Sequence, residues 1–404
     1  MRKMFSKMVC ALAAMTAATG AFAQSLPPVR IGVLADMSSL YSAIGGQGSI
    51  VATQLAVEDY GGKVLGRPVE VISADHQNKP DVASATVRRW LANENVVAIT
   101  DNATSSPALA VQALLKEQPK ALLLTSGAGA VGLVDEQCSP VGSLWSWNTR
   151  TVARAVPTAA LAQGKKKWFF MTADYAFGKS FQAEAEKVVK AGGGTVAGSV
   201  LHPLNTQDFS SYLLQAQASG ADIIALANAG GDTTNAIKQA HEFRLGTGKQ
   251  SLTALLAFST DIHALGLENA QGLLVLESFI WNRTPETTAF SRRFYARHKA
   301  MPTSVQAGAY SATLHFLKAA DAAGTLDPLK VMEKMRELPV HDMFITNGRL
   351  RQDGLVTHDY YLAEIKTPAE SKEPWDYYKV LRTVTADEAF WPLSESKCPL
   401  VHGG

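Results

Sequence analysis

Short apolar runs alternate with longer amphipathic segments along most of this chain, and this alternation constrains the fold more than any other feature. The apolar runs are residues 29–35, 69–74, 96–100, 121–125, 168–172, 195–201, 223–227, 252–258 and 273–280. Segments with a helical pattern lie between them, at residues 49–60, 81–92, 179–191, 209–219 and 233–243. Near-continuous apolar runs are typical of parallel strands buried on both faces. The pattern therefore predicts an α/β architecture with parallel sheets.

Nine strands are many for a single sheet, so the length of the chain favours two doubly wound domains. We expect the first break near residues 148–151, because a second set of strand-helix units begins at Lys165. A long helical region, residues 286–323, follows the last apolar run. No linker rich in Pro, Gly or Ser separates the halves, which indicates short crossovers rather than a flexible tether.

The N-terminus has the pattern of a secretory signal peptide. Arg2, Lys3 and Lys7 precede an uncharged apolar stretch, residues 8–19, and a small-x-small cleavage pattern ends at Ala23. We therefore exclude residues 1–23 from fold reasoning and expect an exported, periplasmic chain. Cys10 stands too early to accept a lipid at the cleavage point. No later apolar run is long enough to predict a transmembrane helix.

The charge and the cysteines bound the function further. The formal net charge is +2, and the signal peptide carries three of the positive charges, so 2 − 3 leaves the exported chain at −1. A near-neutral chain gives no electrostatic argument for nucleic acid or an anionic membrane as partner. Two cysteines remain after export, Cys138 and Cys398. An even count in an exported protein favours a disulfide, and the alternative is two separate buried thiols.

Open α/β sheets bind ligands at the carboxyl ends of their strands, so the residues that follow each strand are the site candidates. In the first half, three such loops contain Tyr41 and Ile44; Asn102, Ala103 and Thr104; and Ser126, Gly127, Ala128 and Gly129. Ordinary strand-helix loops and helix capping are the alternative interpretations of the first two. The third loop satisfies Gly-x-Gly-x-x-Gly. A dinucleotide site needs that motif in the first strand-helix-strand unit with an acid downstream, so backbone donors for a carboxylate fit better.

In the second half, two loops offer further candidates. Tyr175 and Phe177 follow one strand, and aromatic rings there can cover a ligand from the opposite lobe. Their alternative is a small satellite core. Asn228 and Ala229 follow the strand at 223–227, where small residues leave room for a ligand and Asn228 offers a polar contact. The nearby Asp232 can instead cap the next helix.

Catalytic signatures are missing from the sequence. The nine histidines are scattered, with none at metal-ligand spacing to another. There is no Gly-x-Ser-x-Gly elbow and no Walker A loop. We therefore expect a protein with no catalytic residues, no metal site and no cofactor.

The chain resembles the branched-chain amino-acid-type periplasmic binding proteins of ABC transporters. The segments that carry the resemblance occur in family order at residues 30–34, 36–48, 56–59, 174–178, 207–210 and 220–222. The resemblance implies two doubly wound parallel-sheet lobes joined by three crossovers, the type I periplasmic binding protein fold, with the ligand in the cleft. It also implies an N-terminal lobe at 24–148, a C-terminal lobe at 149–278, a return to the first lobe at 279–347, and second-lobe strands with a tail returning to the first lobe at 348–404.

The resemblance also assigns roles to the candidate residues. Matching positions that hold a ligand carboxylate in the N-terminal lobe are Asn102, Thr104, Ser126, Gly127 and Gly129. Tyr175 and Phe177 match the aromatic residues that close over the ligand.

This chain departs from the amino-acid binders at two positions. Ala229 and Gly230 stand where they have a tyrosine, and Asp261 is the only acid near the position of their ammonium-binding glutamate. With Trp281 as a further cleft candidate, these departures favour an aromatic acid over an α-amino acid.

The resulting hypothesis is the solute-binding component of an importer, which closes two lobes around a small carboxylate and delivers it to membrane permease subunits. The first alternative is a ligand-sensing receptor of the same fold that signals to a partner protein. An exported enzyme is the second alternative.

Overall fold

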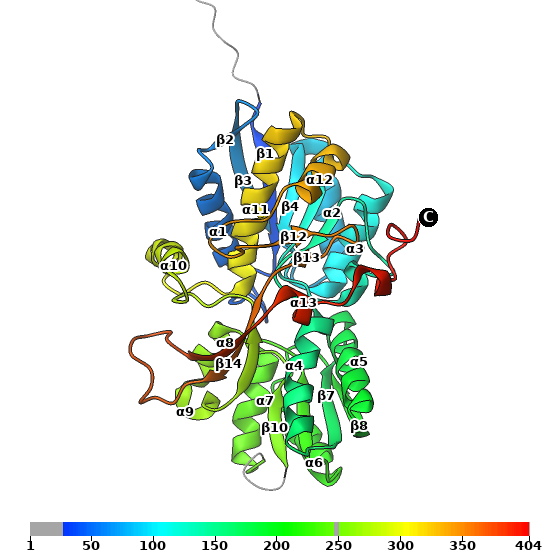
Figure 1. The fold of residues 1–404 in the computed structure, drawn as a ribbon, viewed down its shortest axis with the longest axis vertical. Coiled ribbons are helices and arrows are strands. Elements are labelled where there is room, and N and C mark those ends of the chain that lie inside the picture. The colour runs from blue at the N-terminus through cyan, green and yellow to red at the C-terminus, as the bar shows by residue number, and fades with distance from the viewer. Residues whose placement is uncertain (1–26, 246–249, 404) are drawn as a thin grey trace, which may run out of the picture.

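The computed structural model describes residues 27–245 and 250–403, so the predicted signal peptide lies outside the described residues. Two α/β lobes are stacked along the longest axis of the molecule, with the N-terminal lobe uppermost (Figure 1). The chain passes between them three times: before α4, after β11 and before β14. Two doubly wound lobes joined by three crossovers are confirmed. No helix in the described ranges is long and apolar enough to cross a membrane.

The first lobe contains a six-stranded sheet in the order β2-β3-β1-β4-β5-β6. Its strands are β1 (Val29–Ala35), β2 (Lys63–Val64), β3 (Arg67–Asp75), β4 (Val96–Asp101), β5 (Leu122–Thr125) and β6 (Gly142–Leu144). All neighbours are parallel except β2 and β3. The strand order reverses between β1 and β4, and loops that diverge at such a point leave a crevice for a ligand.

Several helices belong to the first lobe. They are α1 (Gly46–Asp59), α2 (Pro80–Arg89), the π-helix η1 (Trp90–Glu94), α3 (Ser105–Glu117), the 3-10 helix η2 (Val131–Leu133), α10 (Pro285–His298), α11 (Ser304–Ala323) and α12 (Pro328–Glu337). The predicted helical region 286–323 is therefore two helices, α10 and α11. The break has a physical cause, because Lys299 adopts a left-handed φ of 64° and Pro302 follows.

The second lobe contains a four-stranded parallel sheet in the order β10-β9-β7-β8. Its strands are β7 (Lys167–Ala173), β8 (Thr195–His202), β9 (Ile223–Ala227) and β10 (Ser251–Ala254). Its helices are α4 (Thr149–Ala162), α5 (Ala176–Ala191), α6 (Ser210–Ala218), α7 (Gly231–Glu242), α8 (Ser259–Leu265) and α9 (Leu267–Ala270). The strand predicted at 252–258 is shorter than expected, because β10 ends at Ala254 and the chain turns into α8.

A third sheet, β11-β14-β15, extends the second lobe. It is formed by β11 (Leu274–Glu277), β14 (Tyr360–Ile365) and β15 (Tyr378–Val384). The interpretation of residues 273–280 as a parallel strand was wrong, because β11 pairs antiparallel with β14. A continuous apolar run does not reveal its partner, and here the partner lies more than 80 residues later in the chain.

The small hairpin of β12 (Arg349–Leu350) and β13 (Val356–Thr357) lies against the first sheet. The amide of Leu144 in β6 donates to the carbonyl of Gly354, and Leu144 also bridges to Leu355. Residues 349–357 thus lie beside the first lobe. The chain returns to the second lobe with β14.

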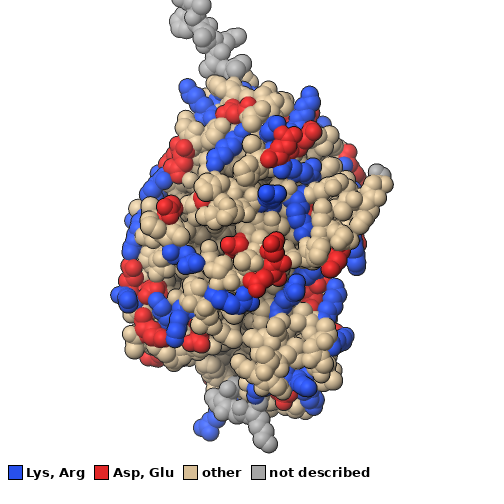
Figure 2. Space-filling model, in the orientation of Figure 1, with Lys and Arg blue, Asp and Glu red and all other residues tan. Residues whose placement is uncertain are grey.

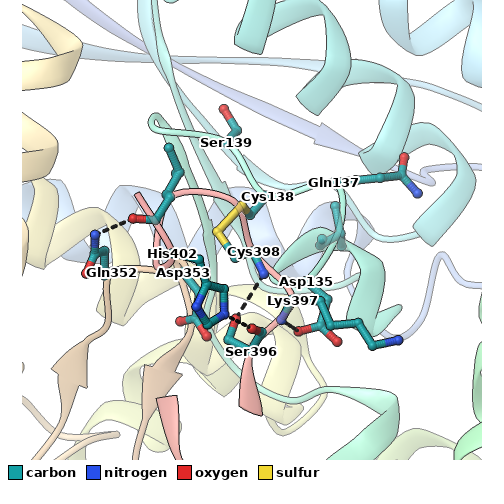
Figure 3. Close-up of a disulfide and its surroundings, with 12 residues drawn as sticks. Asp135, Gln137, Cys138, Ser139, Gln352, Asp353, Ser396, Lys397, Cys398 and His402 are labelled. Atoms are coloured by element: carbon teal, nitrogen blue, oxygen red, sulfur yellow. Dashed lines mark hydrogen bonds between the residues drawn. A yellow bond between two sulfur atoms is a disulfide. The ribbon is translucent and has the colours of Figure 1, made fainter. Parts of the chain in front are cut away.

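The C-terminal tail contains α13 (Ala386–Ala389) and the 3-10 helix η3 (Leu393–Glu395), and it runs back to the first lobe (Figure 1). The predicted Cys138–Cys398 disulfide is confirmed and joins residues 260 positions apart (Figure 3). Asp135 supports this attachment: its carboxylate accepts a hydrogen bond from the Lys397 amide and forms an ion pair with Arg150 of α4. The Asp135 carboxylate therefore contacts both the C-terminal tail and the helix that follows the first crossover.

Acidic and basic side chains are interspersed over the face shown in Figure 2, without a field of a single sign. Two ion pairs link the helices α10 and α1 of the first lobe. Arg293 and Arg297 of α10 each donate two hydrogen bonds to a carboxylate of α1, those of Asp59 and Glu58.

Candidate functional site

A small cavity lies between the two lobes, at the carboxyl ends of both parallel sheets. The residues that line it are Tyr41, Ile44, Ala103, Thr104, Ser105, Gly127, Ala128, Gly129, Trp147, Tyr175, Phe177, Ala229 and Phe258. Its volume is about 20 Å³, which is room for about one water molecule. A ligand with a ring therefore requires the lobes to part or the side chains to shift.

The loop that carries Tyr41 is organised by a buried aspartate at the end of β1. The Asp36 carboxylate accepts hydrogen bonds from the amides of Ser39 and Tyr41, and from the side chain of Asn78. A fully buried carboxylate with several charge-assisted bonds holds its loop in one conformation. Asp36 thus positions Tyr41 from the first lobe.

Tyr41 meets Tyr175 of the second lobe across the cleft. Their hydroxyl oxygens are 2.7 Å apart, and their ring centroids are 6.3 Å apart. Burial raises the pKa of both phenols above their ordinary value, so both hydroxyls are neutral around pH 7. A neutral phenol both donates and accepts, and the pair is a direct polar link between the lobes.

Gly230 explains one departure from the amino-acid binders. Its φ is 60°, and a Cβ atom there would lie 2.9 Å from the carbonyl oxygen of Leu40 and 3.2 Å from the ring of Tyr41. A side chain at this position would push the two loops apart. The absence of the tyrosine thus allows the β9–α7 loop to pack on Tyr41, and Ala229 lines the cavity.

An aromatic wall encloses most of the cavity. The ring of Trp147 meets Phe177 and Phe258 edge to face, with centroids 5.6 and 5.9 Å away. Trp147 and Phe258 were not predicted as site residues. The available signal for Trp147 was the apolar segment 144–147, which follows β6 and precedes the helix cap Asn148. Sequence reasoning did not treat that segment as a site candidate.

The polar groups of the cavity differ from those predicted. The amides of Ser126 and Gly127 both donate to the carbonyl of Asp101, each at 3.0 Å. The amide of Gly129 donates to the hydroxyl of Ser105 at 3.4 Å. These three amides are bonded within the protein in this structure, and the idea that the backbone of 126–129 holds a ligand carboxylate stays a prediction.

Other donors remain available at the cavity. The side-chain hydroxyl of Thr104 is buried and has no partner within residues 27–245 and 250–403, although Thr104 stands at the N-cap of α3. The first amides of α3, those of Ser105 and Ser106, have no helical acceptor. The start of a 13-residue helix favours an anion. No acidic side chain lines the cavity in the described part of the chain.

Ten of the fifteen predicted ligand-binding residues line this cavity. Of the other five, three make contacts elsewhere. Asn228 bonds to His202 and Thr233 inside the second lobe. Trp281 donates from its indole nitrogen to the carbonyl of Trp375. Asp261 accepts from the amide of Phe258 as part of the cap of α8.

The last two, Asn102 and Ser126, are fully buried at the ends of β4 and β5, but they do not line the cavity. Their side-chain polar atoms have no partner among the residues described. Asn102 and the preceding Asp101 both have left-handed φ angles, 53° and 70°. Such backbone conformations are uncommon for residues other than glycine and are found at functional sites.

Asp101 is a buried acid next to both cavity loops. Its carboxylate oxygens lie 2.5 Å from the Cβ positions that side chains at Gly45 and Gly127 would occupy. Burial raises the pKa of Asp101 to about 7. The two glycines leave space for this carboxyl group.

Two lobes that close on a cavity at the carboxyl ends of their sheets define a two-lobed ligand-binding protein. The match to known proteins agrees: a family model described as periplasmic binding protein matches residues 28–372, and the chain belongs to this family. The fold is thus the type I periplasmic binding protein fold. Its members bind small molecules and work with ABC transporters.

Solved structures support the assignment. A periplasmic binding protein from Burkholderia mallei is 46% identical, with a TM-score of 0.89, over 92% of this chain and 99% of that chain. A branched chain amino acid ABC transporter periplasmic ligand-binding protein from Burkholderia xenovorans LB400 is 43% identical, with a TM-score of 0.82, over 92% and 100%. A solute binding protein from R. palustris, in complex with 4-hydroxybenzoate, is 23% identical, with a TM-score of 0.79, over 89% and 97%. The last of these shows similarity of fold alone.

Proposed function

We propose that this protein is the solute-binding component of an ABC importer and that its ligand is a small carboxylate with an aromatic body. One observation carries the proposal: five of the thirteen residues lining the cavity are aromatic, and its polar groups are hydroxyls and helix-terminal amides. Aromatic rings bury a planar apolar body, and the start of α3 favours a carboxylate.

The same geometry favours an aromatic acid over an α-amino acid. An α-ammonium group needs a carboxylate partner when it leaves water. Asp261 is the acid nearest in sequence to the cavity residue Phe258, but its carboxylate accepts from the Phe258 amide and does not line the cavity. Burial also raises the pKa of Asp261 to about 7, so its carboxyl group is partly protonated near pH 7 and attracts an ammonium group less. The fold itself is compatible with such a ligand, since the R. palustris protein of the same fold was solved in complex with 4-hydroxybenzoate.

Transport requires the lobes to open and close, and the cavity volume of about 20 Å³ implies this motion. A ligand that binds the closed form better shifts the equilibrium toward it. The permease subunits would then recognise the closed form. We also propose that residues 1–23 are removed on export, and that the lobes comprise 24–148 with 279–347 and 149–278 with the strands of 348–404, except that the hairpin 349–357 lies beside the first lobe. The tail, 385–404, attaches to the first lobe.

A binding screen tests the proposal. The protein is unfolded and refolded to remove any carried ligand, then titrated calorimetrically with benzoate, 4-hydroxybenzoate, phenylalanine and leucine. An aromatic acid should bind and, at 100 times its Kd, should add about 2.7 kcal/mol to the free energy of unfolding. Tight binding of leucine with no response to either aromatic acid would contradict the ligand class.

A further inference from the structure

One residue of the cavity wall carries a buried hydrogen-bond donor for which the described residues offer no acceptor. Trp147 is 6% exposed and lies in the first crossover, between β6 and α4. Its indole nitrogen is buried and has no hydrogen-bond partner in the part of the chain that the structure describes. Trp147 lines the cavity directly. A buried N–H without an acceptor is costly, so such a group calls for an explanation.

Two other buried indoles in this protein illustrate the usual arrangement, in which the N–H has an acceptor. The indole nitrogen of Trp145 donates to the Ser311 hydroxyl at 2.9 Å, and that of Trp168 donates to the Lys165 carbonyl at 3.1 Å. Trp391 also has no acceptor within the described ranges, but it lies outside the ligand cavity, where Arg150 covers its ring. Among the tryptophans that the structure describes, Trp147 is the one that both lines the cavity between the lobes and has an unmatched indole N–H.

The position of the Trp147 ring is tightly constrained. A Cβ atom at Gly129 would lie 2.2 Å from the ring, so glycine at that position is what makes room for the indole. Phe177 and Phe258 contact the ring edge to face from the second lobe. These neighbours restrict the rotamer of the ring in the closed form, which reduces the entropy cost of a hydrogen bond from the indole N–H to a ligand held there.

We infer that Trp147 is a specificity-determining residue, whose indole N–H is reserved for an acceptor oxygen of the ligand. The inference rests on the proposed function and narrows it. An indole nitrogen only donates, so it accepts no bond from an ammonium group. An acceptor such as a carboxylate or ring hydroxyl oxygen satisfies it. A site with a buried donor strongly rejects analogues that leave the donor unpaired.

The test removes the N–H and keeps the ring. Position 147 receives 3-benzothienylalanine, a near-isosteric tryptophan analogue with sulfur in place of N–H, and the matched control carries it at position 145. Each protein is compared with wild type in two ways: the Tm of the refolded, ligand-free protein, and the Kd for 4-hydroxybenzoate. Trp147→Phe, with the same two measurements, serves if the analogue at 147 prevents folding.

At position 147 we expect an unchanged or higher Tm and about tenfold or more weaker binding, the scale for a hydrogen bond to a charged group. At position 145 we expect a lower Tm, from the lost bond to Ser311, and unchanged Kd. A drop in Tm at 147 like that at 145 overturns the inference, and so does an unchanged Kd. If wild type binds no aromatic acid, the proposed ligand class fails, and the Tm comparison alone then decides whether the protein itself uses this N–H.

Discussion

The Tyr41 hydroxyl lies 2.7 Å from the Tyr175 hydroxyl, and this hydrogen bond joins the two lobes at the edge of the ligand cavity. Tyr41 is held by the Asp36 loop of the first lobe, and Tyr175 stands at the N-cap of α5 in the second. The bond forms only while the lobes are close together. It therefore contributes to the closed form and not to an open one.

Replacing Tyr175 with phenylalanine should shift the lobes toward the open form. The change leaves the buried Tyr41 hydroxyl without its partner, at a cost of about 1 kcal/mol or more, which is roughly a fivefold shift in the equilibrium. Small-angle X-ray scattering should record a larger radius of gyration. Tyr212→Phe is the control, because Tyr212 lies in the second lobe and packs on His202 and Phe209. Identical scattering from Tyr175→Phe and wild type would show that this bond does not hold the lobes.

Thr104→Val should weaken binding without unfolding the protein. The substitution keeps the side-chain shape and removes a cavity hydroxyl that makes no capping bond. For a carboxylate ligand the expected loss is about 1.5–3 kcal/mol, or roughly 10- to 150-fold in Kd by calorimetry. Thr100→Val is the matched control, because Thr100 is a buried threonine of the neighbouring strand that does not line the cavity. Equal Kd values for the two variants would remove Thr104 from the site.

Asp101→Asn should change how stability depends on pH. The pKa of Asp101 is raised from 3.8 to about 7 by burial, so between about pH 4 and pH 7 the folded protein keeps a proton that the unfolded chain has lost. The free energy of unfolding therefore falls as pH rises through this window, by up to about 4 kcal/mol from this group. Asparagine stays neutral, and it tolerates the left-handed φ of 70°.

Urea unfolding at pH 5 and pH 8 measures this effect. Asp101→Asn should gain stability relative to wild type at pH 8 and gain less at pH 5. The stability of the variant should still depend on pH to some extent, because other buried acids also have raised pKa values. These values are about 7 for Asp261 and Asp232 and about 8 for Glu277. The exposed Asp208 is the control, since Asp208→Asn should give no gain at pH 8. The same pH dependence in Asp101→Asn and wild type would show that this carboxyl group is ionised in the folded protein.

Reduction of Cys138–Cys398 should destabilise the protein markedly. The bond closes a loop with a sequence separation of 260 residues, for which the chain-entropy model gives about 5 kcal/mol. Urea unfolding with and without a phosphine reductant measures the difference. The variant carrying Cys138→Ala and Cys398→Ala is the control and should match the reduced protein. Two reactive thiols in denatured, unreduced periplasmic protein would contradict the disulfide.

The ligand site shows where sequence reasoning succeeded. Thr104, Gly129, Tyr175 and Ala229 follow strands that their own apolar runs predict, and the carboxyl ends of parallel strands converge on one edge. Placing a loop just after such a strand was therefore enough to bring it near the cleft, although Asn102, Ser126 and Asn228 in these loops do not line the cavity. The same reasoning does not show which loop atoms are already hydrogen-bonded within the protein. The Gly129 amide, for example, donates to the Ser105 hydroxyl.

Local periodicity and strand-end position are encoded within about ten residues, so the sequence alone determined the α/β class, the order of strands and helices, and the loops that form the cleft. Contacts between distant segments were decided only by the tertiary structure. It pairs β11 antiparallel with β14 and brings Trp147 of the crossover against Phe258 of the second lobe. Each depends on which buried surfaces of distant segments fit together, and packing of that kind leaves no periodic signal in either segment.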